Sequence, residues 1–276
     1  MSVVNFYLSG DGEHDRVIRA FYQGCPESNE RNILSVQDYQ PSDIAVVFGV
    51  RKIAVPFSQH RGRVFDEQEA ASKTTVVLET GYLKRGSGED DYYAAGIGGL
   101  NGRAWFRNHR CKPDRWEKLG IELRPWRTAG EHIVLCGQVP WDASVDFTDH
   151  VAWLKAAVGR IRYHTQRPIV FRPHPKAKIP PIAGCEYSTK PLADDLVNAW
   201  AVVTFNSNAG VDAAVAGIPV FVDDVGAMAS GVENKNLVYL EDPGTPEREQ
   251  WAYNLAFCQW APSEMRDGLA WNHLFP

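Results

Sequence analysis

One histidine lies in a short motif that suits phosphate chemistry. In RPHPK, residues 172–176, two prolines flank His174 and stiffen the turn, and Arg172 and Lys176 add positive charge. An imidazole N–H can donate to a phosphate oxygen, and the two cations can neutralise the charge that grows on a departing phosphate. The motif therefore predicts a phosphate-binding turn. The alternative is an ordinary loop histidine beside prolines that only end a strand.

A second motif, about thirty residues further on, also suits an anion. Asn206, Ser207 and Asn208 precede a run of small residues at 209–216, which predicts a short helix. The first backbone N–H groups of such a helix are free, and together with the Ser207 hydroxyl they can hold a phosphate. An ordinary helix cap uses the same geometry, so both interpretations stay open. Two phosphate-type turns in one half of the chain are a stronger signal than either alone.

Two carboxylates follow apolar runs and could act as a base. Glu79 directly follows the run at 74–78 and precedes Gly81, which permits a sharp turn, and Asp11 stands between two glycines after the first apolar run. Partial desolvation raises the pKa of a carboxyl group and fits it to take a proton from a hydroxyl nucleophile. Glu79 is the preferred base and Asp11 the competing one. The alternative for Glu79 is a surface ion pair with Lys84 or Arg85.

Other catalytic centres have no support in the sequence. The glycine-rich segment GIGGLNGR at 96–103 lacks both the G-x-G-x-x-G spacing after a strand and a Gly-Lys-Ser/Thr sequence. The remaining histidines show no H-E-x-x-H spacing, and the five cysteines form no C-x-x-C pair. We therefore expect neither a dinucleotide or P-loop site nor a bound metal.

Short β-branched apolar runs must position these residues. They alternate with helical patterns, the clearest of which covers 147–163 after Asp146 as its cap. The runs lie at 3–8, 44–48, 74–78, 132–136, 169–171, 201–205, 219–222 and 237–240. This alternation predicts parallel sheets with helices on both faces, which bind ligands beyond the carboxyl ends of their strands.

The organisation of the chain suggests two such sheets. RPWRTAGE at 124–131 separates two halves, and a helical pattern at 246–260 could pack back on the first half. We expect an α/β fold with two Rossmann-like domains that face a cleft. The predicted boundaries are 1–128 for an acceptor-side domain, 129–245 for a donor-binding domain, and 246–276 for a C-terminal helix and tail on the first domain.

Composition narrows the function classes. The 276 residues are 44% hydrophobic and 23% charged, which excludes disorder, and no apolar run is long enough to cross a membrane. A net charge of -5 disfavours a protein that coats nucleic acid, yet residues 101–127 carry eight basic and three acidic side chains among aromatic ones. This basic segment could bind phosphates and stack on rings, or it could be a solvated face. We expect a cytoplasmic protein and leave its oligomeric state open.

Three motifs in order resemble a known family. ETG at 79–81, RPHP at 172–175 and FNSNAGVDAAVAGIPV at 205–220 are similar to the motifs of GT-B glycosyltransferases of the bacterial sialyltransferase and capsular Kdo-transferase type. The resemblance implies that Glu79 is the general base, His174 a donor-phosphate ligand and Ser207 a phosphate anchor. It also implies a nucleotide sugar as co-substrate and no other cofactor. Thr80 departs from the family, which usually has a second acid there.

Four further passages resemble phage-encoded glycosyltransferases that modify hydroxymethylated pyrimidines in DNA. They are ETGYLKR, GGLNGRAWF, PWR and GQVPWDASV. This resemblance implies a 5-hydroxymethylpyrimidine in DNA as the acceptor and the cytoplasm of a phage-infected bacterium as the setting. The residues expected to contact the acceptor are Tyr82, Lys84, Arg85, Asn101, Arg103, Trp105 and Arg107. Two alternatives stay open, a capsular or lipopolysaccharide glycan as acceptor and a nucleotide-binding protein without catalysis.

Overall fold

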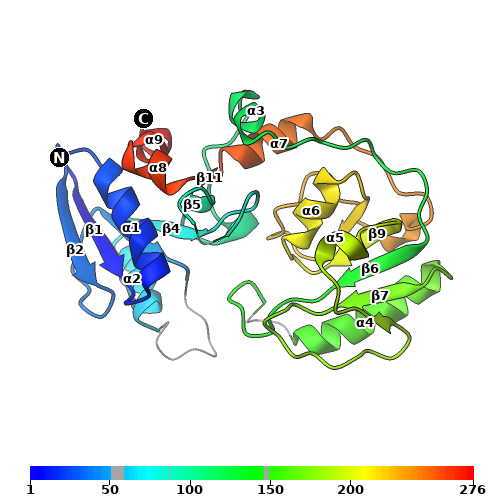
Figure 1. The fold of residues 1–276 in the computed structure, drawn as a ribbon. Helices are drawn as coiled ribbons and strands as arrows, with labels where there is room; N and C mark the ends of the chain where they lie inside the picture. Colours follow the sequence, from blue (N-terminus) through cyan, green and yellow to red (C-terminus); the bar gives the residue numbers. More distant parts are fainter. Residues whose placement is uncertain (51–58, 87, 146–148) are drawn as a thin grey trace. The chain divides into compact units, whose positions relative to one another are not determined.

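The computed structural model describes residues 1–50, 59–86, 88–145 and 149–276, which form two compact units. Unit 1 consists of Met1–Leu119 and Ala252–Pro276, and unit 2 of Gly120–Trp251 (Figure 1). The sequence predicts boundaries at 128/129 and 245/246. The first boundary between the units lies nine residues before the predicted one, and the second lies six residues after it. Both units are α/β, as predicted.

Unit 1 is built on a six-stranded sheet in the order β11-β5-β4-β3-β1-β2. Its strands are β1 (Val3–Leu8), β2 (Glu30–Ser35), β3 (Ile44–Phe48), β4 (Thr74–Thr80), β5 (Tyr93–Ile97) and β11 (Gln259–Trp260). β1 to β4 pair in parallel, whereas β5 and β11 pair antiparallel, which the prediction of parallel sheets did not include. The connection at 81–92 contains no helix among its described residues, so β5 returns beside β4 without a crossover helix.

The C-terminal tail packs on the first helix of unit 1. The helices among the described residues of this unit are α1 (Gly12–Gly24), α2 (Gln59–Ala70), η2 (Asn101–Arg103), α3 (Asp114–Leu119), α8 (Pro262–Arg266) and α9 (Leu269–Leu274). A Cβ at Gly24 would lie 1.9 Å from the Met265 carbonyl oxygen, so this glycine permits the close contact of α1 with α8. Trp271 of α9 packs on Phe21 of α1 with ring centroids 5.5 Å apart. The segment predicted as a helix over 246–260 forms α7 (Glu249–Ala256), a turn, and then strand β11.

Unit 2 contains a five-stranded parallel sheet in the order β10-β9-β6-β7-β8. Its strands are β6 (His132–Cys136), β7 (Ile169–Arg172), β8 (Glu186–Tyr187), β9 (Ala199–Thr204) and β10 (Val220–Val222). Its helices are α4 (His150–His164), α5 (Leu192–Asp195), α6 (Ala209–Val215) and η3 (Leu237–Tyr239). β9 is buried along its whole length, as expected for a central strand with both faces covered.

Two local predictions in unit 2 are wrong. The run at 237–240 is not a strand but the 3₁₀ helix η3, because Asn236 Oδ1 accepts a hydrogen bond from Val238 N at 3.0 Å and Val238 and Tyr239 are exposed. The cap of α4 is Asp149, whose Oδ1 accepts from Ala152 N at 2.9 Å. Asp146, the predicted cap, lies outside the described residues.

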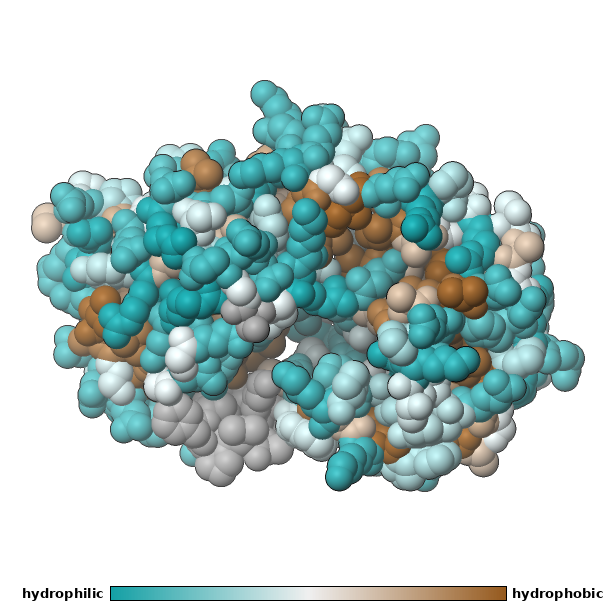
Figure 2. Space-filling view, viewed as in Figure 1, coloured by the Kyte–Doolittle hydropathy of each residue, from teal (hydrophilic) through white to brown (hydrophobic). Residues whose placement is uncertain are grey.

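The face of the molecule in Figure 2 is mostly hydrophilic, and its hydrophobic residues form separate patches. No helix within the described residues has the length and apolar character that a membrane span requires.

Candidate functional site

The two phosphate-type turns lie at the same edge of the unit 2 sheet. His174 follows β7 and Ser207 follows β9, and both strands pair in parallel with β6 between them. Neighbouring strands lie about 4.8 Å apart, so the starts of the two turns are separated by about 10 Å. This edge is where the carboxyl ends of parallel strands place ligands.

His174 presents one nitrogen as a donor. Its Nδ1 accepts a hydrogen bond from Lys176 N at 3.1 Å, so the proton of the neutral ring is on Nε2. Burial is the main cause that lowers the pKa of His174, with Lys176 and Arg172 acting in the same direction and Asp142 against them. These effects favour the neutral ring, whose Nε2–H can donate to an anion.

Ser207 and Asn208 lie at the start of α6. The Ser207 hydroxyl accepts from Ala209 N at 3.2 Å, and Ser207 remains partly exposed. Asn208 is the N-cap residue, but its side chain makes no capping hydrogen bond. The serine hydroxyl thus supports the turn and can donate its own proton outward.

Asn206 links the loops rather than facing solvent. It is 3% exposed, and its backbone N–H donates to Gln138 Oε1 at 3.0 Å, while Gln138 Nε2 donates to Asn206 Oδ1. Asn206 Nδ2 donates to the Ser144 carbonyl oxygen at 3.0 Å and to Asp224 Oδ2. Sequence reasoning placed Asn206 among the phosphate ligands and missed Gln138 and Asp224, although GQ directly follows strand β6, where a polar side chain reaches the sheet edge.

His150 supports the same network from α4. It is 1% exposed, and its Nε2 accepts from Gln138 N at 2.8 Å. Burial lowers the pKa of His150 to about 4, so the ring is neutral at physiological pH. No side chain in the described ranges hydrogen-bonds to its Nδ1.

Of the two cations in RPHPK, Arg172 has an internal partner. Its NH1 lies 3.1 Å from Asp195 Oδ2 and donates to the Lys190 carbonyl oxygen. Asp195 also accepts from the Ser188 hydroxyl at 2.6 Å. Arg172 therefore fixes the turn, and Lys176 remains as the exposed cation of the motif.

A pocket of about 470 Å³ opens beside RPHPK. Lys178 and Lys190 add positive charge to its wall, and Tyr187, 40% exposed, adds an aromatic ring. The remaining lining residues are Arg172, Pro173, His174, Pro175, Ala177, Ile179, Pro180, Ser188 and Thr189. The pocket thus combines cations, a histidine donor and apolar surface, which suits an anion that carries a ring. Sequence reasoning missed the two lysines and the tyrosine, because no local pattern shows that 187–190 returns beside 173–180.

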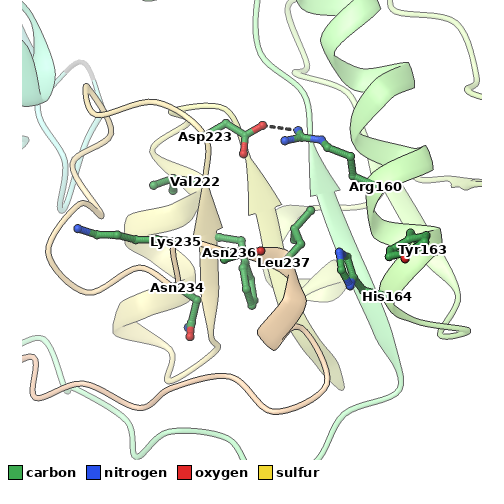
Figure 3. A pocket seen from close by; sticks show the side chains of 10 residues that line it. Arg160, Tyr163, His164, Val222, Asp223, Asn234, Lys235, Asn236 and Leu237 are labelled. Carbon is green, nitrogen blue, oxygen red and sulfur yellow. Dashed lines mark hydrogen bonds and ion pairs between the residues drawn. The ribbon is translucent and has the colours of Figure 1, made fainter.

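Figure 3 shows a second pocket of unit 2, of about 230 Å³, between α4 and the segment after β10. Arg160 NH2 donates to Asp223 Oδ2, which also accepts from Trp153 Nε1 at 2.7 Å. Tyr163 and His164 line the pocket from α4, on the same side as Arg160, and Asn234, Lys235 and Asn236 line the other side. None of the sequence-predicted site residues belongs to this pocket.

In unit 1, Glu79 and Asp11 lie at the carboxyl edge of the parallel strands. Asp11 follows β1 and Glu79 lies in β4, with β3 between these two strands. A Cβ at Gly49, directly after β3, would lie 2.7 Å from Arg61 NH1 and 3.4 Å from Glu79 Oε2, so both side chains cross over this glycine. Because β2 and β3 flank β1 on opposite sides, the Asp11 turn lies at the switch point of the sheet.

The two carboxylates differ in how they are held. Asp11 Oδ1 caps α1 by accepting from Glu13 N at 3.0 Å and His14 N at 3.1 Å, and the bond from His14 is the main cause that lowers the pKa of Asp11. Glu79 is half-buried, and its Oε1 accepts from Thr80 N at 2.9 Å. Arg61, which sequence reasoning missed, donates to the Phe48 carbonyl oxygen at 2.8 Å. Burial lowers the pKa of Arg61, whereas Glu79 and Asp11 raise it.

The residues predicted to contact an acceptor have different surroundings. Tyr82 is 3% exposed, packs edge-to-face on Phe106 at 6.3 Å, and has a strongly raised pKa because it is buried. Arg85 NH1 donates to the Tyr82 carbonyl oxygen at 2.9 Å. Lys84, Arg103, Trp105 and Arg107 are exposed and Asn101 is partly buried. Tyr82 and Arg85 therefore support the loop, and Arg107 NH1 donates to the His273 carbonyl oxygen at 3.4 Å.

The loop at 96–103 is a hydrogen-bonded turn. Ile97 N donates to the Trp105 carbonyl oxygen and Trp105 N to the Ile97 carbonyl oxygen, both at 2.9 Å. Gly98 and Asn101 adopt positive φ angles of 76° and 51°. These bonds and angles define a tight turn between β5 and Trp105.

At least three of the eight basic residues in the segment at 101–127 bind groups within their own units, and Arg103, Arg107, Arg110, Lys112 and Arg124 are exposed. Arg115 and Lys118 both pair with Glu264, at 3.0 and 2.7 Å, and Arg115 also lies 3.8 Å from the Trp260 ring centroid. Arg127 NH1 donates to the carbonyl oxygens of Leu196 and Ala199. The local charge of +5 therefore overstates what this segment offers to a nucleic acid.

No group of histidine, cysteine or acidic side chains suited to a metal ion occurs in the described part of the chain.

Comparisons with known proteins identify the fold. No family model matches the sequence, and no curated protein matches it either. Among solved structures, the beta Kdo 2,7 transferase KpsC of Thermosulfurimonas dismutans is 17% identical, with a TM-score of 0.59 over 98% of this chain and 99% of that chain. The beta Kdo 2,4 transferase of the same organism's KpsC is 12% identical, with a TM-score of 0.61 over 92% and 89%. The chain therefore has the α/β fold of these transferase structures over nearly its whole length.

Proposed function

We propose that the chain is a glycosyltransferase that moves a sugar from a nucleotide-sugar donor to a hydroxyl group of a glycan. One observation carries the proposal: His174, whose Nε2 carries the proton of the neutral ring, lines the same pocket as Lys178, Lys190 and Tyr187. A nucleotide needs a donor and cations for its phosphate and a flat surface for its base. The fold shared with two Kdo transferase structures supports this choice.

Unit 2 binds the donor in this proposal. His174 Nε2–H donates to a phosphate oxygen, and Lys176, Lys178 and Lys190 neutralise the charge that grows as the sugar–phosphate bond breaks. The Ser207 hydroxyl donates to a second phosphate oxygen or to the sugar from the turn after β9. Asn206, Gln138 and His150 position that turn from within the unit.

Unit 1 supplies the base. Glu79 takes the proton of the acceptor hydroxyl while the hydroxyl oxygen forms a bond to the sugar carbon. The bond between that carbon and the donor phosphate breaks, and the nucleotide leaves with its electrons. Asp11 is the weaker base, because its carboxylate caps α1 and its pKa is lowered. Arg61 adds a positive charge beside Glu79 and is one of the causes that lower the pKa of Asp11.

A glycan fits the acceptor role better than DNA. The fold neighbours are Kdo transferases, and at least three of the eight basic residues in the segment that suggested nucleic acid bind groups within their own units. Hydroxymethylated DNA is therefore the alternative acceptor in the experiment below.

The experiment combines a panel of nucleotide sugars with glycan acceptors and with hydroxymethylated duplex DNA, and mass spectrometry detects the gain of a sugar. We expect transfer to a glycan with one donor. The His174→Ala variant should lose about 100-fold in turnover, the usual cost of one donor to a developing negative charge. The matched control is His164→Ala, a histidine of unit 2 in the other pocket, which should keep full activity.

Two results would contradict the proposal. Transfer to DNA alone would exclude the glycan acceptor. Saturable nucleotide binding that His174→Ala abolishes, with no transfer from any donor, would leave a nucleotide-binding protein without catalysis.

A further inference from the structure

We propose that unit 1 carries an anion-binding site on α1, which holds a carboxylate or phosphate group of the acceptor. The inference rests on the proposed function for the identity of its ligand, and it makes the acceptor an acidic glycan. The site consists of Arg16 and Arg19 of α1 with Arg266 of α8, and we call it the arginine pocket.

The arginine pocket has a volume of about 420 Å³ and lies along one side of α1. Gly12, Arg16, Arg19 and Gln23 recur at a spacing of three or four residues, which places them on one face of the helix. Arg266 reaches this face because α8 packs against α1 through the close contact at Gly24. The three guanidinium groups therefore come from two helices that are fixed side by side.

The charge of the arginine pocket is positive. The lining contains three arginines and one carboxylate, Asp15. Both oxygens of Asp15 are occupied, because Oδ1 accepts from Ser9 N at 2.7 Å and from the Ser9 hydroxyl, and Oδ2 accepts from Gly10 N at 3.1 Å. Asp15 thus binds the loop before the helix, and the arginines outnumber it in the lining.

Glu89 forms ion pairs with Arg16 and Arg266 but not with Arg19. Its Oε1 accepts from Arg16 at 2.7 Å and its Oε2 from Arg266 at 2.8 Å, so one carboxylate holds both guanidinium groups. Arg19 is exposed, and no ion pair reaches it from the residues that the structure describes. Three guanidinium groups against two carboxylates, Asp15 and Glu89, leave one net positive charge. Arg16 also donates to the Gly88 carbonyl oxygen and the Tyr93 hydroxyl, so Arg19 and Arg266 are the main donors for an incoming anion. Arginine is the side chain best suited to carboxylate and phosphate.

The arginine pocket lies close to Asp11, one of the two candidate bases of unit 1. Gly12 lines the pocket and directly follows Asp11 at the switch point of the sheet. At 1.5 Å per residue, Arg16 and Arg19 lie about 7 and 12 Å along the helix from Asp11. This is the length of one or two sugar residues, so an acceptor whose acidic group binds here would place a neighbouring hydroxyl near the carboxylates.

The first test measures binding and needs no activity. Inorganic phosphate and glucuronate are titrated at low salt, and the backbone N–H of Gly12 and the arginine Nε–H groups are followed by NMR. We expect saturable shifts in wild type and about tenfold weaker binding in Arg19→Gln and Arg266→Gln, because each change removes a charge-assisted hydrogen bond. The control Arg63→Gln removes an exposed arginine of α2 in the same unit and should bind like wild type.

The second test uses transfer activity and separates the two ligand sources. Pairs of acceptors differ in one group: a uronic acid against its carboxyl-reduced form, and a phosphate ester against its dephosphorylated form. In the pair whose acidic acceptor is used, Arg19→Gln should raise the KM for that acidic acceptor about tenfold. The kcat, the KM for the donor and the kinetics with the neutral acceptor should stay unchanged. Arg19→Lys should fall between wild type and Arg19→Gln.

The arginine pocket would be wrong if the signals of Gly12 and the arginines did not shift on titration. It would also be wrong if they shifted equally in wild type and both glutamine variants. Either result holds whether or not transfer occurs. Equal KM values for acidic and neutral acceptors would overturn its role in acceptor choice. Binding without any transfer would retain the anion site and reject the proposed function.

Discussion

Gln138 and Asn206 are joined by two hydrogen bonds that connect the loops after β6 and β9. The Gln138 side chain accepts from the Asn206 backbone and donates to its side chain, and both residues are more than nine-tenths buried. Asn206 also binds Asp224, so one buried amide ties three loops of the candidate donor edge together. The geometry of Ser207, the next residue, therefore depends on side chains that touch no ligand.

Asn206→Ala should lower the free energy of unfolding by about 2–3 kcal/mol, because it leaves polar groups of Gln138 and Asp224 buried without their partner. Urea unfolding followed by fluorescence measures this change. The exposed Lys235→Ala in the same unit should stay within about 0.5 kcal/mol of wild type. Equal stabilities of the two variants would show that the network contributes little.

The two carboxylates of unit 1 can be separated by isosteric variants. Glu79→Gln should lower kcat by about 10²–10⁴, because it removes the proposed base. Asp11→Asn should keep both stability and most activity, since asparagine caps a helix about as well as aspartate. Steady-state kinetics of the transfer reaction measures kcat for both variants. A larger loss of kcat in Asp11→Asn than in Glu79→Gln would show that Asp11 is the base.

Acid should destabilise the protein through His150. Its pKa is lowered from 6.5 to about 4 in the folded state, so between these values the unfolded chain binds a proton that the folded chain does not. The free energy of unfolding should therefore fall by about 3 kcal/mol as the pH decreases from 6.5 to 4, and this contribution should stop changing below pH 4. Urea unfolding at a series of pH values measures it.

His150→Phe should remove that pH dependence, although it will be less stable at pH 7 because Gln138 N loses its acceptor. His109→Ala, at an exposed histidine, should retain the wild-type slope. An unchanged slope in His150→Phe would assign the acid sensitivity to other groups.

Two glycine-to-alanine substitutions should change the free energy of unfolding in opposite directions. A Cβ at Gly81 would lie 2.3 Å from the Tyr92 carbonyl oxygen, so Gly81→Ala should cost about 2 kcal/mol or more by forcing the turn after β4 apart. A Cβ at Gly159, inside α4, would meet no heavy atom within 4 Å outside its own helix turn, so Gly159→Ala should stabilise by about 0.5–1 kcal/mol. Thermal unfolding compares them, and a destabilising Gly159→Ala would show that this position is crowded.

Local patterns along the chain were enough to predict the most regular elements. Apolar β-branched runs such as 3–8 and 132–136 became buried strands at the predicted residues, since their pattern depends only on neighbours along the chain. The same patterns predicted that Asp11, His174 and Ser207 follow strands and that Glu79 lies at the end of one, and the structure has these positions. Polar β2 and short β11 were missed, because pairing with a neighbouring strand rather than local pattern makes them strands.

Which polar side chains remain available to a ligand depends instead on contacts between distant parts of the chain. Arg172, Arg115 and Asn206 look like ligands in the sequence, yet Asp195, Glu264 and Gln138 bind them from positions 23 to 149 residues away. Lys178, Tyr187 and Lys190 look ordinary in the sequence, yet they line one pocket with His174. Hydrogen bonds and ion pairs form between groups that are close in space, and chain folding alone determines which groups those are.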